Sequence, residues 1–522
     1  MIDGGGVVGG GSILAGHTMS GLLFKEKGVE RSDETRSLMD PRTVSSTSEA
    51  VDVGAVEVET DAMNIDAVIN LLDWGKFHWL LLLQCGLSWA CDAAEMMLLS
   101  FLVPRITPVL MPNASKSERD HYGFLLSAMT FAGIWLGALI FGKVSDRLGR
   151  KRGYLISTAV VGGFGLLCST AQTMEFLIAM RTIVGVGLGG VTCGVTLFSE
   201  TVAEKYRGAS IILSIGALWT FGCVFETCVA WFCFSLSGTQ WRLFLVLSAM
   251  PSISLLAMFP WLVESPRYLA VTGRMDKAVE VLKLAAQKNR VRLPHNFKLV
   301  APKRPAHNQS HLRTLLGKKL RVTTLLLWGL WFCSVISYYG LSFVTPLYFS
   351  FQNGNEYVVT LLSALAEIPG MVATSYLVDR IGRKKTKAVM FSAGGAATLV
   401  LSFNSLPFGV LTLAAIVGRG SVLGAFNDLY VYTPEVYPTT SRAFGLGLCS
   451  AVARIAGIIV SYISFANESA SEAASAVLVY SIAAFAGAVL SMMLPYETKG
   501  RKLEDNDTDN SAGTLEAGDE RD

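Results

Sequence analysis

The chain has 522 residues, of which 51% are hydrophobic and only 16% are charged, with a net charge of +3. In a soluble protein of this length about a quarter of the residues would be charged. The small net charge gives no indication of nucleic-acid binding. The composition therefore excludes an ordinary soluble domain and indicates that lipid surrounds much of the chain.

Apolar segments of roughly 20 residues, each long enough to cross about 30 Å of hydrocarbon, recur along the chain. The segments at the two ends, 1–73 and 496–522, are polar and aperiodic, which predicts disordered tails. We expect an all-α membrane protein with twelve membrane spans, at residues 77–103, 122–142, 153–171, 174–197, 209–234, 242–262, 323–349, 357–378, 387–404, 408–431, 443–466 and 472–494.

Lysine and arginine gather in the loops that follow spans two, four, six and eight. The positive-inside rule therefore predicts that both termini and the 263–322 loop are cytosolic. The loops expected on the other side contain the sequons of Asn113 and Asn467. Both asparagines are candidate glycosylation sites if the protein passes through a secretory pathway.

The chain contains an internal repeat. The sequence SDRLGRKR at 145–152 is echoed by VDRIGRKK at 378–385. The pair Glu200 and Arg207, seven residues apart, is echoed by Glu435 and Arg442. The repeat predicts two six-span halves, 74–262 and 323–495, joined by a cytosolic linker at 263–322 that contains short helices.

Parallel six-span repeats with these loops resemble the major facilitator superfamily. WLVESPRYLAVTGRMDKAVEVL after span six and LPYETKGRKLED after span twelve are similar to the ends of that family's two bundles. GKFHWLLLLQCGLSWACDAAEMMLLSFLVP resembles the first span of synaptic-vesicle-related proteins and of nicotinate transporters, and FGLGLCSAVARIAGIIVSYIS resembles span eleven of that group and of organic anion and cation transporters. The resemblance implies two pseudo-symmetric six-helix bundles that transport by alternating access. Span seven lacks the paired glutamines of hexose porters, which argues against a sugar substrate.

Charged residues at the cytosolic ends of the spans are candidate gate residues. The resemblance implies that such clusters latch the cytosolic side in the outward-open state, whereas the alternative is that the charges only set topology. The candidates are Asp146, Arg147, Arg150, Glu200 and Arg207 in the first half, with Asp379, Arg380, Arg383, Glu435 and Arg442 in the second.

Seven ionisable residues lie deep within predicted spans, where each costs about 2.5–3.5 kcal/mol to insert and is a functional candidate. A rise of about 1.5 Å per residue puts several of them near the middle of the bilayer. In the family, the spans that carry them line or flank a central cavity. The candidate substrate- or proton-binding residues are Asp92, Glu95, Arg181, Glu226, Glu367, Arg419 and Arg454.

Asp92 and Glu95 are three residues apart, on nearly one face of a helix. We expect them to form a proton-coupling site or a cation contact, or else to pair structurally with Arg181 or Arg419. The planar fork of Arg454 suits a carboxylate, and the alternative is an ion pair with Glu367 or an acid of span one. Six aromatic residues could stack a flat ring or simply pack: Trp89, Trp219, Trp328, Trp331, Tyr338 and Tyr339.

The sequence contains no GxxxxGK[ST], HExxH or GxSxG motif, so it predicts neither ATP-driven transport nor an enzyme, and no cofactor or metal ion is expected. We expect a monomeric secondary transporter in the plasma membrane or a vesicle membrane, which moves a small organic ion, leaning to a nicotinate-like carboxylate, together with protons. The alternatives are a carrier of an organic cation or sugar-like solute, and a vesicle or receptor protein of the same fold that transports nothing.

Overall fold

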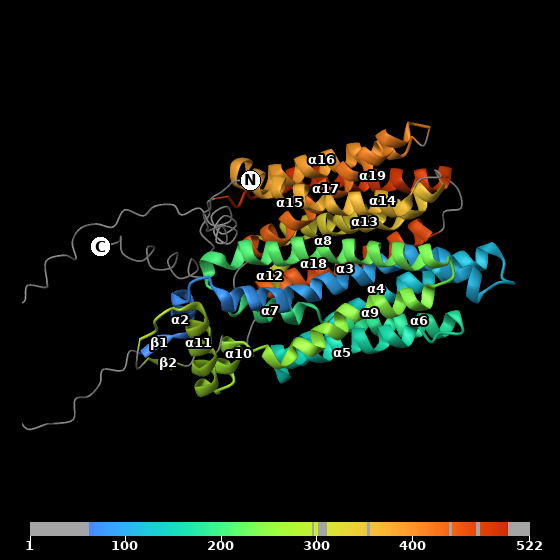
Figure 1. Cartoon of the computed structure of the whole chain (residues 1–522). Coiled ribbons are helices and arrows are strands. Elements are labelled where there is room, and N and C mark those ends of the chain that lie inside the picture. Colours follow the sequence, from blue (N-terminus) through green and yellow to red (C-terminus); the bar gives the residue numbers. More distant parts are fainter. Residues whose placement is uncertain are drawn as a thin grey trace, which may run out of the picture. The chain divides into compact units, whose positions relative to one another are not determined.

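The computed structural model describes residues 62–294, 297–300, 311–351, 355–403, 405–437, 441–465 and 470–499, and most of them lie in helices (Figure 1). The helices of the first half are α3 (Lys76–Leu110), α4 (Lys116–Leu148), α5 (Arg150–Cys168), α6 (Met174–Leu188), α7 (Thr192–Ser199), α8 (Glu204–Leu236) and α9 (Trp241–Met258), after which a short 3-10 turn covers Phe259–Trp261. Those of the second half are α13 (Arg321–Phe351), α14 (Glu356–Leu365), α15 (Glu367–Ile381), α16 (Arg383–Leu401), α17 (Phe408–Val436), α18 (Arg442–Phe465) and α19 (Ala470–Met493).

These helices confirm the predicted fold class. Ten helical segments of the described residues are long and apolar enough to cross a membrane. The remaining two predicted spans, the third and the ninth, are the 19-residue helices α5 and α16. Each begins with three consecutive basic residues, RKR in α5 and RKK in α16. A tight turn leads directly into each helix, and its glycine, Gly149 or Gly382, adopts a φ of 104° or 87°.

Two predicted spans consist of two helices each. The fourth breaks between α6 and α7, where Gly189 lies so close to α4 that an added Cβ would sit 2.4 Å from the backbone nitrogen of Ala138. Small residues allow such close backbone packing in lipid. The eighth breaks between α14 and α15 at Ala366.

Residues on both sides of the first bundle in the sequence form a small additional unit. Residues 62–71 fall within the segment expected to be disordered, yet they form β1 (Ala62–Asn64) and α2 (Ile65–Leu71). β1 pairs in parallel with β2 (Lys298–Val300), and the linker also contains α10 (Pro266–Val271), α11 (Met275–Asn289) and α12 (His311–Leu315). The reason is an apolar stripe: Ile65, Val68 and Ile69 have the i, i+3, i+4 spacing of a helix face, and they share a buried cluster with α11.

The two halves pack against each other through α3 with α13, α4 with α18, and α8 with α14. The starts of α5 and α16, at Arg150 and Arg383, mark one end of the helices, here called the basic end. The unit of β1, β2, α2, α10 and α11 lies at this end too, while the turn between α3 and α4 lies at the other (Figure 1).

Candidate functional site

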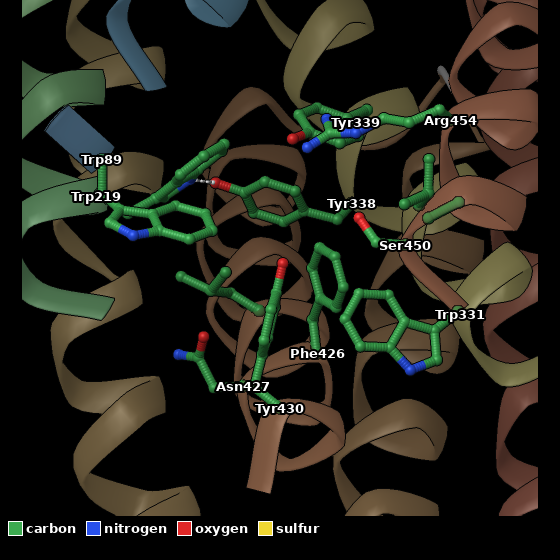
Figure 2. Close-up of a pocket in the computed structure, with 13 residues that line it drawn as sticks. Trp89, Trp219, Trp331, Tyr338, Tyr339, Phe426, Asn427, Tyr430, Ser450 and Arg454 are labelled. Carbon is green, nitrogen blue, oxygen red and sulfur yellow. Dashed lines mark hydrogen bonds between the residues drawn. The ribbon is translucent and has the colours of Figure 1, made fainter. Parts of the chain in front are cut away.

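A cavity lies between the halves, near the middle of the helices. It is lined by α3, α8, α13, α17 and α18, which correspond to spans one, five, seven, ten and eleven (Figure 2). The lining residues are Trp89, Trp219, Trp331, Val335, Tyr338, Tyr339, Leu423, Phe426, Asn427, Tyr430, Ser450, Ala453 and Arg454. The centre of a water molecule has only about 20 Å³ in which to move. The aromatic side chains thus nearly fill the space, and an organic ligand would have to displace them.

Five of the six aromatic residues singled out in the sequence line this cavity, and Trp328 does not. Trp89 contacts Trp219 with ring centroids 6.0 Å apart, and Tyr430 with centroids 6.1 Å apart. Trp219 comes from the first half and Tyr338 from the second, and the indole Nε1 donates a 2.5 Å hydrogen bond to the phenol oxygen. The aromatic wall therefore belongs to both halves.

Arg454 is the cationic residue of the cavity lining. Its guanidinium lies beside the phenol of Tyr339 (Figure 2), and it interacts electrostatically with Asp92. The two charges are not in direct contact, and one oxygen of the buried Asp92 carboxylate, Oδ1, has no hydrogen-bond partner among the described residues. Arg454 thus lies near an acid of span one, the partner that one of the alternatives named, but the two do not form an ion pair.

Glu95 has a different partner. Its Oε2 accepts a 2.5 Å bond from Nη1 of Arg181, and its backbone oxygen accepts one of 3.2 Å from Nη2. Glu226 lies near this pair, where its Oε1 accepts from the Ser248 hydroxyl at 2.6 Å and its Oε2 has no partner in the described part of the chain. Two acids and one arginine therefore form a buried group inside the first half.

Glu367 and Arg419 form the matching buried pair of the second half, with Nε and Oε1 2.7 Å apart. The Tyr338 hydroxyl also donates to Oε1, and the hydroxyl of Thr220, from the first half, donates to Oε2, each at 2.7 Å. Glu367 therefore connects the wall of the cavity, the buried arginine and the opposite half of the protein.

A third buried pair was missed in the sequence. Lys387 of α16 and Asp428 of α17 are both fully buried, with Nζ and Oδ2 3.3 Å apart, and the ammonium lies 3.9 Å from the ring centroid of Tyr432. Asp428 falls inside predicted span ten, and this position alone could have marked it as a buried acid. Lys387 is the first residue of predicted span nine, directly after the basic loop, so its charge looked like one that only sets topology.

At the basic end the charged residues pair within each half. Arg150 contacts Asp146 at 2.9 Å and Glu200 at 3.3 Å, and the Ser265 hydroxyl donates to Glu200. Arg147 is exposed, and its backbone oxygen accepts a hydrogen bond from the Tyr268 hydroxyl. The side chain of Arg207 lies outside the described residues.

The second half repeats this arrangement. Arg383 contacts Glu435 at 3.1 Å, and the Thr498 hydroxyl donates to Glu435. Asp379 and Arg380 are exposed, and the Arg380 guanidinium lies over the Tyr376 ring. Arg442 is partly buried but is not the partner of Glu435.

Two glutamates that the sequence analysis did not single out hold these clusters in place. The Glu264 carboxylate accepts from the backbone N–H of Lys151, and that of Glu497 accepts from those of Arg383 and Lys384. Each carboxylate thus binds the free N–H groups at the start of α5 or α16, as anions commonly do at helix N-termini. Both lie in segments that resemble the ends of the family's two bundles, but a single sequence does not show where their side chains point.

A further cluster lies at the end opposite the basic loops. Arg105 of α3 forms an ion pair with Glu356 of α14 and donates to the Tyr357 hydroxyl at 2.7 Å. The Tyr357 ring stacks on Trp231 of α8 at a centroid distance of 6.2 Å. This cluster joins the two halves. The sequence did not indicate this cluster, because Arg105 lies beyond the predicted end of span one at 103, whereas α3 continues to Leu110.

The two candidate glycosylation sites differ in what the structure says of them. Asn113 is exposed in the turn between α3 and α4, at the end opposite the basic loops, and the serine of its sequon caps α4. Asn467 lies outside the described residues. In the described part of the chain, no three His, Cys, Asp or Glu side chains gather as metal ligands would.

Comparison with known proteins agrees with this architecture. Residues 96–509 match the family model "Sugar (and other) transporter". Synaptic vesicle 2-related protein of Xenopus laevis is 35% identical over 470 residues, 85% of this chain and 83% of that protein. The niacin transporter NiaP of Acinetobacter baylyi is 30% identical over 452 residues, 85% of this chain and 99% of that protein.

Among solved structures, the xylose transporter XylE of E. coli, in a partially occluded inward-open conformation, matches with a TM-score of 0.66. The match covers 82% of this chain and 99% of that one at 17% identity, so it bears on the fold alone. The chain belongs to the sugar (and other) transporter family of the major facilitator superfamily, and it is a multi-pass membrane transporter and not an enzyme.

Proposed function

We propose that this member of the sugar (and other) transporter family is a proton-coupled carrier of a small organic anion, with a flat aromatic carboxylate of the nicotinate type as the favoured substrate. The observation that carries the proposal is Arg454, a permanent cation in the lining of an aromatic cavity at the centre of the protein. A guanidinium binds a carboxylate through two parallel hydrogen bonds, and tyrosine and tryptophan rings stack a flat ring.

Asp92 supplies the coupling to protons. While it is ionised it competes with the substrate for the field of Arg454. Its unpartnered Oδ1 makes the buried charge costly, and a proton removes that cost. Protonation of Asp92 then leaves Arg454 for the substrate carboxylate, so that proton and anion bind together and are carried in the same direction.

Alternating access requires contacts between the halves that break at one end while others form. The Arg105–Glu356 pair and the bonds of Thr220 and Trp219 are such contacts, and they run from the cavity to the end opposite the basic loops. By the positive-inside rule we infer that the basic end is cytosolic. The described conformation is then closed toward the outside, and the ion pairs at the basic end, formed within each half, are positioned to regroup when that end closes.

The relative named for synaptic vesicles makes a vesicle membrane the favoured location, and the plasma membrane is the other. A monomer is sufficient for this mechanism, since both halves of the cavity come from one chain. Asn113 would be glycosylated on the lumenal or outer face.

The test is uptake of labelled nicotinate into proteoliposomes with and without an imposed proton gradient. We expect accumulation driven by an inward proton gradient and abolished by an uncoupler. Binding without any flux would instead favour a non-transporting receptor of the same fold.

A second candidate substrate is an organic cation, and a specific observation favours it: the unpartnered Oδ1 of Asp92 could bind an ammonium group. Competition by a quaternary ammonium ion, with none by nicotinate or benzoate, would replace the anion proposal with this one. A sugar-like solute is less favoured, because it is neutral and makes no use of the charge of Arg454 in the cavity lining.

A further inference from the structure

Two hydrogen-bond donors in the wall of the cavity have no partner within the described part of the chain. Nε1 of Trp89 and Nδ2 of Asn427 are buried and make no hydrogen bond to any residue that the structure describes, and both side chains are only 6% exposed. Buried donors are nearly always satisfied in folded proteins, and each one left unsatisfied is costly. Such donors in a binding cavity therefore point to a ligand that accepts from them.

The other two tryptophans of the cavity show the difference. Nε1 of Trp219 donates to the Tyr338 hydroxyl, and Nε1 of Trp331 donates to the Thr433 hydroxyl at 3.1 Å. Their N–H groups are therefore used within the protein. Packing alone does not account for Trp89 in the same way, because its indole lines the same space with its donor unused.

The two free donors come from different halves and lie apart from the cation. Trp89 is on α3 and Asn427 on α17. In Figure 2, Asn427 and Arg454 lie on opposite sides of the group of rings formed by Tyr338, Phe426 and Tyr430. A ligand whose anionic group reaches Arg454 would thus present its far edge to neutral N–H donors.

We propose that Trp89 and Asn427 form a subsite that recognises a neutral hydrogen-bond acceptor on the ring of the substrate, opposite or meta to its carboxylate. The chemical class is an aromatic acid with a ring nitrogen or a carbonyl oxygen. This inference rests on the proposed function, which assigns the carboxylate to Arg454. A protonated ring nitrogen or an ammonium group has no lone pair to offer, so the subsite also selects against cations.

The test uses two ligands that differ at a single ring atom. Nicotinate (pyridine-3-carboxylate) and benzoate have the same carboxylate and nearly the same shape, but only nicotinate has a ring acceptor. Binding to the purified full chain is measured by titration calorimetry and by thermal shift. We expect the wild type to bind nicotinate about ten- to a hundredfold more tightly than benzoate, the ratio that the satisfaction of one buried donor, or of two that share the ring lone pair, supplies.

The variants Asn427→Leu and Trp89→Phe should each reduce this ratio severalfold while the affinity for benzoate stays within about threefold. Asn427→Met, which is uncharged and has no N–H donor, serves if Asn427→Leu does not fold. The matched control is Trp328→Phe: this indole also has a buried Nε1 without a partner among the described residues, but it lies outside the cavity lining, so its loss should leave the ratio unchanged.

Equal affinity of the wild type for the two acids would overturn the subsite and leave the proposed function standing, provided that both acids lose affinity in Arg454→Ala. A ratio that falls as much in the control variant as in Asn427→Leu would also overturn it. If the wild type binds neither acid but binds a quaternary ammonium ion, the proposed function itself fails, and the subsite fails with it.

Discussion

Arg105 and Glu356 form an ion pair that joins the two six-helix halves. The Arg105 guanidinium also lies 4.3 Å from the ring centroid of Phe234 and donates to Tyr357. The two charged side chains are only 22% and 16% exposed, so water screens their attraction only in part. The cluster is therefore a lock between the halves at the end opposite the basic loops.

Glu356→Gln should weaken this lock and shift the protein toward the conformation that is open at that end. Hydrogen bonds to charged groups contribute about 1.5–3 kcal/mol, so the population ratio should change by about ten- to a hundredfold. A cysteine placed at Ser127, which is buried and bonded to Ser461 between α4 and α18, reports the opening through its rate of reaction with a membrane-impermeant thiol reagent. The double charge reversal Arg105→Glu with Glu356→Arg is the control and should restore slow labelling. Unchanged labelling in Glu356→Gln would contradict the lock.

Asp92→Asn should uncouple transport from the proton gradient. The amide cannot ionise, so it no longer competes for Arg454, and substrate exchange between two pools should persist while gradient-driven accumulation is lost. The measurement compares exchange with net uptake in proteoliposomes at two external pH values. Ser88→Ala, a change one turn away on the same helix, is the control and should keep both activities. Retained accumulation in Asp92→Asn would remove this residue from the coupling mechanism.

Arg454→Lys should weaken binding of the anion although the charge is kept. A lysine is a point charge and cannot make the paired hydrogen bonds of a guanidinium with a carboxylate. We expect the affinity for nicotinate to fall about tenfold or more, with a larger loss in Arg454→Ala. Titration calorimetry on the folded variants measures both. Equal affinity in wild type and Arg454→Ala would show that the carboxylate binds elsewhere.

The span count, the two-half organisation and the identity of most buried charges could be predicted, because hydropathy and repeated motifs are local properties of the sequence. Partners could not. Asp92 and Glu95 are three residues apart, which at about 100° per residue leaves them roughly 60° apart around the helix. That is enough for Glu95 to reach Arg181 while Asp92 faces the side of Arg454.

The same limit applies to Lys387 and Asp428. One could be read as the end of a basic loop and the other as an acid near the end of a span, and only packing of α16 on α17 brings them together. The corresponding positions of the first half, counted by the offsets of the repeat, are Tyr154 and Cys193, which are neutral. The repeat therefore gave no hint of a charge pair there.

Asp428→Asn should destabilise the second half strongly, since it leaves the Lys387 ammonium buried without its counter-ion. Breaking a buried pair from one side costs about 3–5 kcal/mol. The apolar double variant Lys387→Met with Asp428→Leu should recover most of the loss, because it removes both charges together. Thermal unfolding of the detergent-solubilised protein is the measurement. A double variant as unstable as the single one would mean that the pair contributes more than charge balance.

Glu497 should make the stability of the basic end depend on pH. Burial opposes ionisation of its carboxyl, but hydrogen bonds from the backbone N–H groups of Arg383, Lys384 and Lys499 outweigh this and hold its pKa below the ordinary value. A carboxyl whose pKa is lower in the folded state contributes stability above the pKa of the unfolded chain, about 4.3, and loses it as the pH falls through the folded value.

Glu497→Gln should therefore lower the thermal unfolding temperature at pH 7 and have a smaller effect near pH 4, where the wild-type carboxyl begins to be protonated as well. The group is partly exposed, so the effect at neutral pH should be modest, about 1 kcal/mol or less. Glu280→Gln, on the exposed face of α11, is the control and should show little pH-dependent difference from the wild type. If Glu497→Gln destabilised the protein equally at both pH values, the carboxylate charge would not be the stabilising feature, and the hydrogen bonds at the start of α16 would be made equally well by a neutral side chain.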